Sequence, residues 1–64
     1  MSTAEFTAGE HVLWCSREVI VDAARYEHYV TLAIPDGWVY DIRDPVTGKI
    51  LLFAANAREL TRMP

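Results

Sequence analysis

The chain has few side chains that could catalyse a reaction or bind a metal ion. His11 and His28 are its two histidines, and Cys15 is its single cysteine. Their spacing matches no zinc-ligand pattern, since the sequence contains neither His-x-His nor Cys-x-x-Cys. The apolar neighbours Leu13 and Trp14 offer no positive charge to activate a thiolate at Cys15. We expect a buried or half-buried structural thiol there, and no catalytic residue, metal site or cofactor.

Three aspartates are the remaining candidates for acid and base chemistry. Asp36 and Asp44 fall in predicted turns, and Asp41 falls on the polar face of a predicted strand. Carboxylates in turns usually accept hydrogen bonds from nearby backbone N–H groups, and those on a polar strand face are usually solvated. We therefore expect all three to be solvated and structural.

Aromatic residues are the side chains best suited to binding. The sequence has two Phe, two Trp and three Tyr. Aromatic rings attract cations and stack on bases, but small domains also use them to fill a thin core. We expect Trp14 and Phe53 to lie in the core or in a subunit contact. Tyr26 and Trp38 lie beside predicted turns, so we expect them to be exposed and available to a ligand or partner.

A hairpin around Pro35-Asp36-Gly37 is the strongest structural signal. Pro presets φ near about −65° and Gly accepts a positive φ, as a tight turn requires. The runs on either side, 29–34 and 38–43, are rich in β-branched and aromatic residues, so we expect them to pair. Further strands are expected at 11–15, 19–24, 50–55 and 61–63, with a second hairpin loop at 44–49. The segment 22–27 could instead form a short helix.

Alternation of apolar and polar residues predicts which side chains face the core. In 38–43, Tyr40 and Ile42 are expected inward, with Asp41 and Arg43 in water. For 19–24, the expected inward residues are Val19, Val21 and Ala23, and the outward ones Ile20, Asp22 and Ala24.

A chain of this size cannot bury all of its apolar side chains. In 50–55, either Ile50 and Leu52 or Leu51 and Phe53 remain on the outer face, whichever phase is chosen. The other residues of this expected outer apolar set are Leu13, Ile20, Ala33 and Trp38. Monomeric proteins rarely expose large contiguous apolar patches, so the set predicts self-association into a homo-oligomer.

Length, composition and charge limit the class of protein. A chain of 64 residues with 52% hydrophobic residues forms one domain and buries only about 60% of its unfolded surface. We expect this domain at 8–64, behind a flexible tail at 1–7 that Phe6 can pin. The net charge of −3 disfavours nucleic acid as a partner. The sequence has no secretory signal and no apolar run of about 18 residues, which indicates a cytoplasmic protein that does not contact a membrane.

Three local features resemble the SH3-like small β-barrels of the Tudor and KOW type. They are Phe6-x-x-Gly9-Glu10-x-Val12, Tyr29-x-Thr31-x-Ala33-x-Pro35-Asp36-Gly37, and the turn Asn56-Ala57-Arg58-Glu59-Leu60 before a last strand. The resemblance implies an all-β barrel of five to six strands with a single short helical turn near the C-terminus, in which Leu60 closes one end.

Tudor domains hold methylated side chains in a box of aromatic rings. By this resemblance Trp14 and Tyr29 are the nearest matches to box residues, and Tyr26 is a possible third wall. The chain departs from the Tudor pattern in its first loop, expected at 16–18, which is short. It also departs at 35–38, where Pro-Asp-Gly-Trp replaces an aspartate and aromatic pair.

These observations favour a non-enzymatic, self-associating binding module. A protein or peptide is a possible partner, and the candidate binding residues are Trp14, Tyr26, Tyr29 and Trp38. One alternative is a small oligomeric enzyme with a pore site on a symmetry axis, lined by Tyr29, Thr31 or Asp36. The other is a nucleic-acid-binding regulator, which would require its arginines to gather on one face: Arg17, Arg25, Arg43, Arg58 and Arg62.

Overall fold

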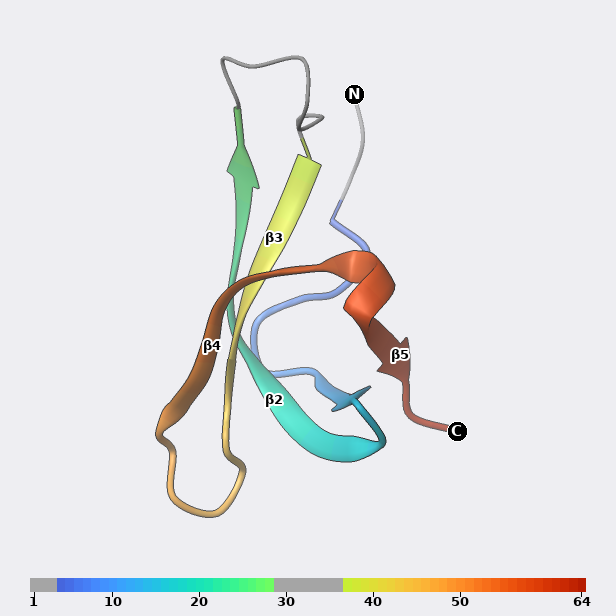
Figure 1. Cartoon of the computed structure of the whole chain (residues 1–64), viewed down its shortest axis with the longest axis vertical. Coiled ribbons are helices and arrows are strands. Elements are labelled where there is room, and N and C mark those ends of the chain that lie inside the picture. Colours follow the sequence, from blue (N-terminus) through green and yellow to red (C-terminus); the bar gives the residue numbers. More distant parts are fainter. Residues whose placement is uncertain (1–3, 29–36) are drawn as a thin grey trace.

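A computed structural model describes residues 4–28 and 37–64 and places them in a single antiparallel sheet. The strands are β1 (His11–Trp14), β2 (Arg17–Glu27), β3 (Gly37–Arg43), β4 (Ile50–Asn56) and β5 (Leu60–Arg62), with a 3₁₀ turn η1 (Ala57–Glu59) before β5. Their order across the sheet is β4-β3-β2-β1-β5, so β4 and β5 are its edges (Figure 1). The predicted all-β class is confirmed.

The turn between β1 and β2 is a tight two-residue hairpin. Trp14 pairs with Arg17, which leaves Cys15 and Ser16 as the turn residues, with φ of 52° and 65°. Positive φ at both central residues is the type I′ geometry that matches the twist of the flanking strands. The first loop is therefore Cys15-Ser16 and not 16–18. The expectation of a buried thiol is wrong, because Cys15 lies exposed at the tip of this turn.

Strand β2 settles the choice between strand and helix at 22–27 in favour of strand. Val19 and Val21 are buried as expected, but a β-bulge follows between Val21 and Ala23. An extra residue in one strand exchanges the two faces beyond it. Ala24 accordingly packs against the core, and the assignment of Ala23 as inward and Ala24 as outward is wrong.

Strand β2 is also the strand that leads into β3. Tyr26 pairs with Trp38 and Glu27 with Gly37, while the other neighbour of β3 is β4. The described neighbours of 38–43 are therefore 17–27 and 50–56, and the partner expected for it, 29–34, lies outside the described residues. Gly37 begins β3 without a positive φ; among the described glycines, Gly9 and Gly48 have one. The predicted strand at 29–34 and the turn residues Pro35 and Asp36 lie outside the described residues.

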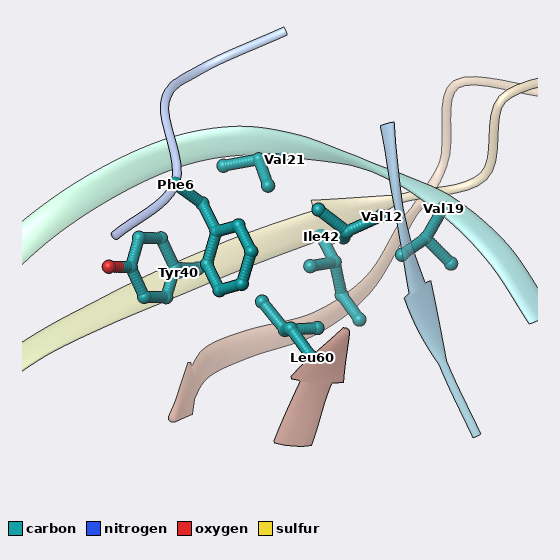
Figure 2. Packing of buried hydrophobic residues seen from close by; sticks show 7 residues of the cluster. All are labelled: Phe6, Val12, Val19, Val21, Tyr40, Ile42 and Leu60. Carbon is teal, nitrogen blue, oxygen red and sulfur yellow. The ribbon is translucent and has the colours of Figure 1, made fainter. Parts of the chain in front are cut away.

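The core is a cluster of seven buried side chains from four strands and the N-terminal segment. They lie between β2 and β3 on one side and β5 on the other (Figure 2): Phe6, Val12, Val19, Val21, Tyr40, Ile42 and Leu60. The inward positions predicted for Tyr40 and Ile42 are confirmed, as is the burial of Leu60. Phe6, only 1% exposed, packs edge-on against Tyr40 with ring centroids 5.4 Å apart, so the N-terminal segment is part of the core.

The predicted hairpin loop at 44–49 joins β3 to β4. The Asp44 carboxylate accepts hydrogen bonds from the backbone N–H groups of Thr47 and Val46, at 3.0 and 2.7 Å, and pairs with Arg17. Gly48 has the positive φ expected of it, 75°, and donates to the Asp44 carbonyl oxygen at 2.9 Å. The hydrogen bonds that the carboxylate accepts from Thr47 and Val46, and then its pairing with Arg17, lower the pKa of Asp44 below its ordinary value of 3.8.

The lowered pKa predicts an acid-sensitive contribution of Asp44 to stability. A carboxyl whose pKa is lower in the folded than in the unfolded chain stabilises the fold above its unfolded pKa, and this stabilisation is lost as pH falls through the folded pKa. We expect Asp44→Asn to lower the Tm by at most a few degrees at neutral pH, and the difference to shrink as the pH falls below the ordinary pKa of 3.8. Thermal unfolding of both proteins across this range checks it. A Tm difference independent of pH would contradict the prediction.

Candidate functional site

Two of the four candidate binding residues lie together. Tyr26 and Trp38 face each other across β2 and β3, with ring centroids 5.7 Å apart in an edge-to-face arrangement, and His28 packs on Tyr26 at 5.0 Å. Tyr26 is 42% exposed, as expected beside a turn, whereas Trp38 is half-buried against the core. The pair forms a small aromatic surface near the ends of β2 and β3 that extend beyond the other strands (Figure 1).

The other two candidates do not join this surface among the described residues. Trp14 pairs with Arg17 at one end of β2, whereas Tyr26 lies near its other end, nine residues farther along the strand, and pairs with Trp38. Trp14 instead packs partly buried against the core, which agrees with the core assignment made for it. Tyr29 lies outside the described residues. A box combining Trp14 with Tyr26 is therefore not formed.

A group of exposed apolar side chains lies in the edge strand β4 and in the loop before it. Phe53 is 67% exposed and Ile50 36% exposed, and Val46 in the preceding loop is also exposed. The assignment of Phe53 to the core of the chain is wrong. No residue of β4 carries a charge. Natural edge strands commonly carry charges or proline that discourage contact with other chains, so the composition of β4 is unusual for an edge.

Two β-bulges explain why neither phase predicted for 50–55 describes β4: Leu51 is an extra residue between the pairs Arg43–Ile50 and Ile42–Leu52, and a second bulge follows Leu52. Ile42 pairs with Leu52 and Tyr40 with Ala55, so two residues, Phe53 and Ala54, lie opposite the single residue Asp41. Ala54 has a φ of 61°. This left-handed conformation costs roughly 1 kcal/mol for a residue with a Cβ atom. Leu51 and Leu52 both pack against the core, while Phe53 projects from the bulge into solvent.

Asp41 lies opposite this bulge and is not solvated as expected. It is 8% exposed, and its Oδ1 accepts hydrogen bonds from the backbone N–H of Ala54 at 3.0 Å and from the Arg25 guanidinium at 2.8 Å. Arg25 also pairs with Glu27 at 3.1 Å. A nearly buried carboxylate is normally satisfied in this way. Asp41 therefore links three neighbouring strands, β2, β3 and β4.

The rest of the predicted outer apolar set is only partly exposed. Leu13 and Ile20 are half-buried, and Ala33 lies outside the described residues. Ile20 and Ile50 flank Arg43 across the sheet. Arg43 is itself paired with Asp22 at 3.1 Å. Among the described residues, three of the five exposed large apolar side chains, Val46, Ile50 and Phe53, therefore belong to β4 or the loop before it, and the other two are Tyr26 and Met63.

Four of the five arginines pair with carboxylates rather than forming a basic surface. Arg17 pairs with Asp44, Arg25 with Asp41 and Glu27, Arg43 with Asp22, and Arg62 with Glu10. These acidic partners neutralise the positive charge of the arginines, which binding to a phosphate backbone would require. Arg58 lies exposed on η1.

His11 Nδ1 lies 2.7 Å from Glu18 Oε2 in an exposed pair between β1 and β2. No group of three or more His, Cys, Asp or Glu in the described segments could hold a metal ion. Asp36 lies outside these segments, and Asp44 has the turn role expected of it.

Comparison of the chain with protein-family models, with characterised proteins and with solved structures found no match. Within the described residues, no helix has the length and apolar character needed to cross a lipid bilayer.

Sequence reasoning missed the burial of Asp41, which lies on β3 opposite the bulge of β4. Alternation with Tyr40 and Ile42 predicts a solvated Asp41, and the aromatic ring of Phe53 predicts the core or a subunit contact, of which its exposure excludes the core. One signal was present: an apolar run in which every phase exposes large side chains is a run where alternation can break. The position of the break required the pairing register.

Proposed function

We propose that this protein is a small non-enzymatic interaction module that associates with copies of itself through the edge strand β4. The observation that carries the proposal is the 67% exposure of Phe53 on an edge strand without a charged residue. Full burial of a Phe side chain contributes about 1.5–3 kcal/mol, so the exposed part of each ring is a substantial driving force for association.

A second copy of the chain is the partner that this edge fits best. In a two-fold dimer, each copy presents the same surface, so β4 would lie against β4. Because β4 is uncharged, the two copies would place no like charges opposite each other within the strands. Phe53 and Ile50 of one copy would contact the same residues of the other. The short chain would also gain stability, since binding of a partner to the folded state shifts the folding equilibrium.

The available area predicts a weak dimer. A standard stable interface buries roughly 800 Å² per partner, which is between a sixth and a fifth of the 4540 Å² surface of this chain. Phe53 and Ile50 supply only part of that area. Val46 in the β3–β4 loop is exposed and close in sequence, and would enlarge the contact. Association at micromolar to millimolar concentration follows from an interface of this size.

We also propose that the sheet is a bent SH3-like barrel. Four features support this fold: β1 to β4 follow one another across the sheet, β5 returns to pair with β1, a 3₁₀ turn precedes β5, and the core lies between β2, β3 and β5. A reducing compartment such as the cytoplasm suits the exposed thiol of Cys15, the single cysteine of the chain.

The rival functions have less support. The residues named for a pore site, Tyr29, Thr31 and Asp36, lie outside the described part of the chain. Binding to a phosphate backbone would compete with the carboxylates that already pair with Arg17, Arg25, Arg43 and Arg62. Neither rival explains an exposed Phe on an uncharged edge.

Replacing Phe53 by serine tests the proposal. We expect the wild-type mass measured by light scattering to rise toward that of a dimer between low micromolar and about 1 mM protein, and Phe53→Ser to weaken association at least about tenfold. Met63→Ser is the matched control, because Met63 is exposed just after β5 at the opposite edge. Its association should equal that of wild type. A wild-type chain that stays monomeric throughout would overturn the proposal.

A further inference from the structure

Three unusual features coincide at one point of the sheet. Asp41 is a nearly buried carboxylate, Ala54 has a positive φ of 61°, and Phe53, its neighbour, is the exposed ring of the proposed contact. A hydrogen bond of 3.0 Å from the Ala54 N–H to Asp41 Oδ1 joins the first two. Conformations that L-residues avoid persist only where their surroundings impose them, and they gather at functional sites.

We infer that Asp41 is a positioning residue for self-association: its carboxylate holds the Phe53–Ala54 bulge, and the bulge presents the Phe53 ring to a second copy. This inference rests on the proposed function. Arg25 fixes the carboxylate from the other side at 2.8 Å, so the anchor extends from β2 across β3 to β4. The edge strand has no further strand beyond it among the described residues, and the bulge therefore depends on β3 for its support.

The pairing register shows what the bulge does to Phe53. From the pair Ile42 and Leu52, a regular ladder would place Phe53 opposite Asp41 and Ala54 opposite Tyr40. Instead, Ala55 lies opposite Tyr40, and Phe53 shares its partner with Ala54. The extra residue bends the edge and turns the ring out of the ladder. Without the bulge the ring would lie along the outer face beside position 41.

The bulge also limits the kind of contact that the edge can make. A regular, uncharged edge strand invites further strands to add through backbone hydrogen bonds, and such addition does not stop at two copies. A bulge at Phe53 and Ala54 interrupts that backbone template. Association then proceeds through side chains, and a two-fold contact between copies is closed. The same device thus sets where the Phe53 ring lies on the edge and discourages open-ended assembly.

Two pairs of variants test the inference, each with a conservative member. Asp41→Asn keeps an oxygen that accepts from the Ala54 N–H, whereas Asp41→Ala removes it. Ala54→Gly favours a positive φ, whereas the β-branched Ala54→Val resists it without altering Asp41. We expect Asp41→Ala and Ala54→Val to weaken association about tenfold, and Asp41→Asn and Ala54→Gly to associate within about twofold of wild type.

Two readouts separate positioning from a general loss of stability. Hydrogen exchange of the Ala54 amide should accelerate selectively in Asp41→Ala. Val19→Ala destabilises the core away from β4, and should leave both this amide and association unchanged in the folded protein. If folded Asp41→Ala or Ala54→Val associates as wild type while Phe53→Ser does not, the inference is wrong and the proposed function stands. If Phe53→Ser also has no effect, both are wrong. Should Asp41→Ala fail to fold, Ala54→Val decides.

Discussion

Phe6→Ala is expected to leave a large share of the chain unfolded at room temperature. Truncation of a buried Phe costs about 3–5 kcal/mol, through lost burial and the cavity that remains. The total stability of a domain is about 0.05–0.15 kcal/mol per residue, or roughly 3–10 kcal/mol for 64 residues. The stability lost through this one substitution is therefore comparable with the whole stability of the domain at the low end of this range.

Several contacts explain why this residue has so large an effect. The Phe6 ring packs edge-on against Tyr40, and the Arg62 guanidinium lies over it at 5.2 Å from the centroid. The same Arg62 donates to the Glu5 carbonyl oxygen at 2.6 Å, and the Glu5 N–H donates to the Tyr40 hydroxyl at 2.9 Å. Phe6 thus holds together the N-terminal segment, β3 and β5, which lie far apart in the sequence.

Urea denaturation of Phe6→Ala measures this effect. Thr7→Ala is the matched control, because Thr7 is the next residue and its side chain is exposed. We expect the control to change the free energy of unfolding by less than about 0.5 kcal/mol. A Phe6→Ala protein with the wild-type midpoint would mean that the N-terminal segment does not belong to the core.

The strands of this fold were predictable from composition, but their faces were predictable only between bulges. β1, β3, β4 and β5 lie close to the runs expected for them, and Tyr40 and Ile42 face the core as alternation requires. Beyond Val21 in β2, and twice in β4, at Leu51 and beyond Leu52, an added residue reverses the faces. A bulge depends on how two strands pair, and the sequence of one strand does not display it.

The candidate site was less predictable because its residues depend on distant partners. Asp41 is nearly buried because Arg25, from β2, and the Ala54 N–H, from β4, surround it. Alternation along the strand alone predicts that an aspartate between two inward residues lies on the solvent-exposed face. Tyr26 and Trp38 face each other because β2 pairs directly with β3. The sequence places both residues beside turns but does not show that these two strands are neighbours.

Leu60→Ala is expected to lower the free energy of unfolding by about 2–5 kcal/mol, the usual range for a buried leucine. Leu60 is buried in the core cluster and begins β5, which has only three residues. A strand of three residues makes few backbone hydrogen bonds to β1. We therefore expect the Leu60 side chain to anchor β5. The turn η1 directs Leu60 inward, and the Glu59 carboxylate secures that turn by accepting from the Asn56 N–H at 2.8 Å.

Thr61→Ala separates this anchoring role from the general strand preference of β5. Thr61 follows Leu60 in the same strand, pairs with Leu13 and is exposed, so its replacement should cost less than about 1 kcal/mol. Denaturant midpoints of the two variants give the comparison. Equal losses would show that β5 is held by its backbone pairing with β1, and that Leu60 does not close the core. A much larger loss for Leu60→Ala would instead place the closing contact of the fold in this one side chain, which joins the last strand to residues from β1, β2 and β3.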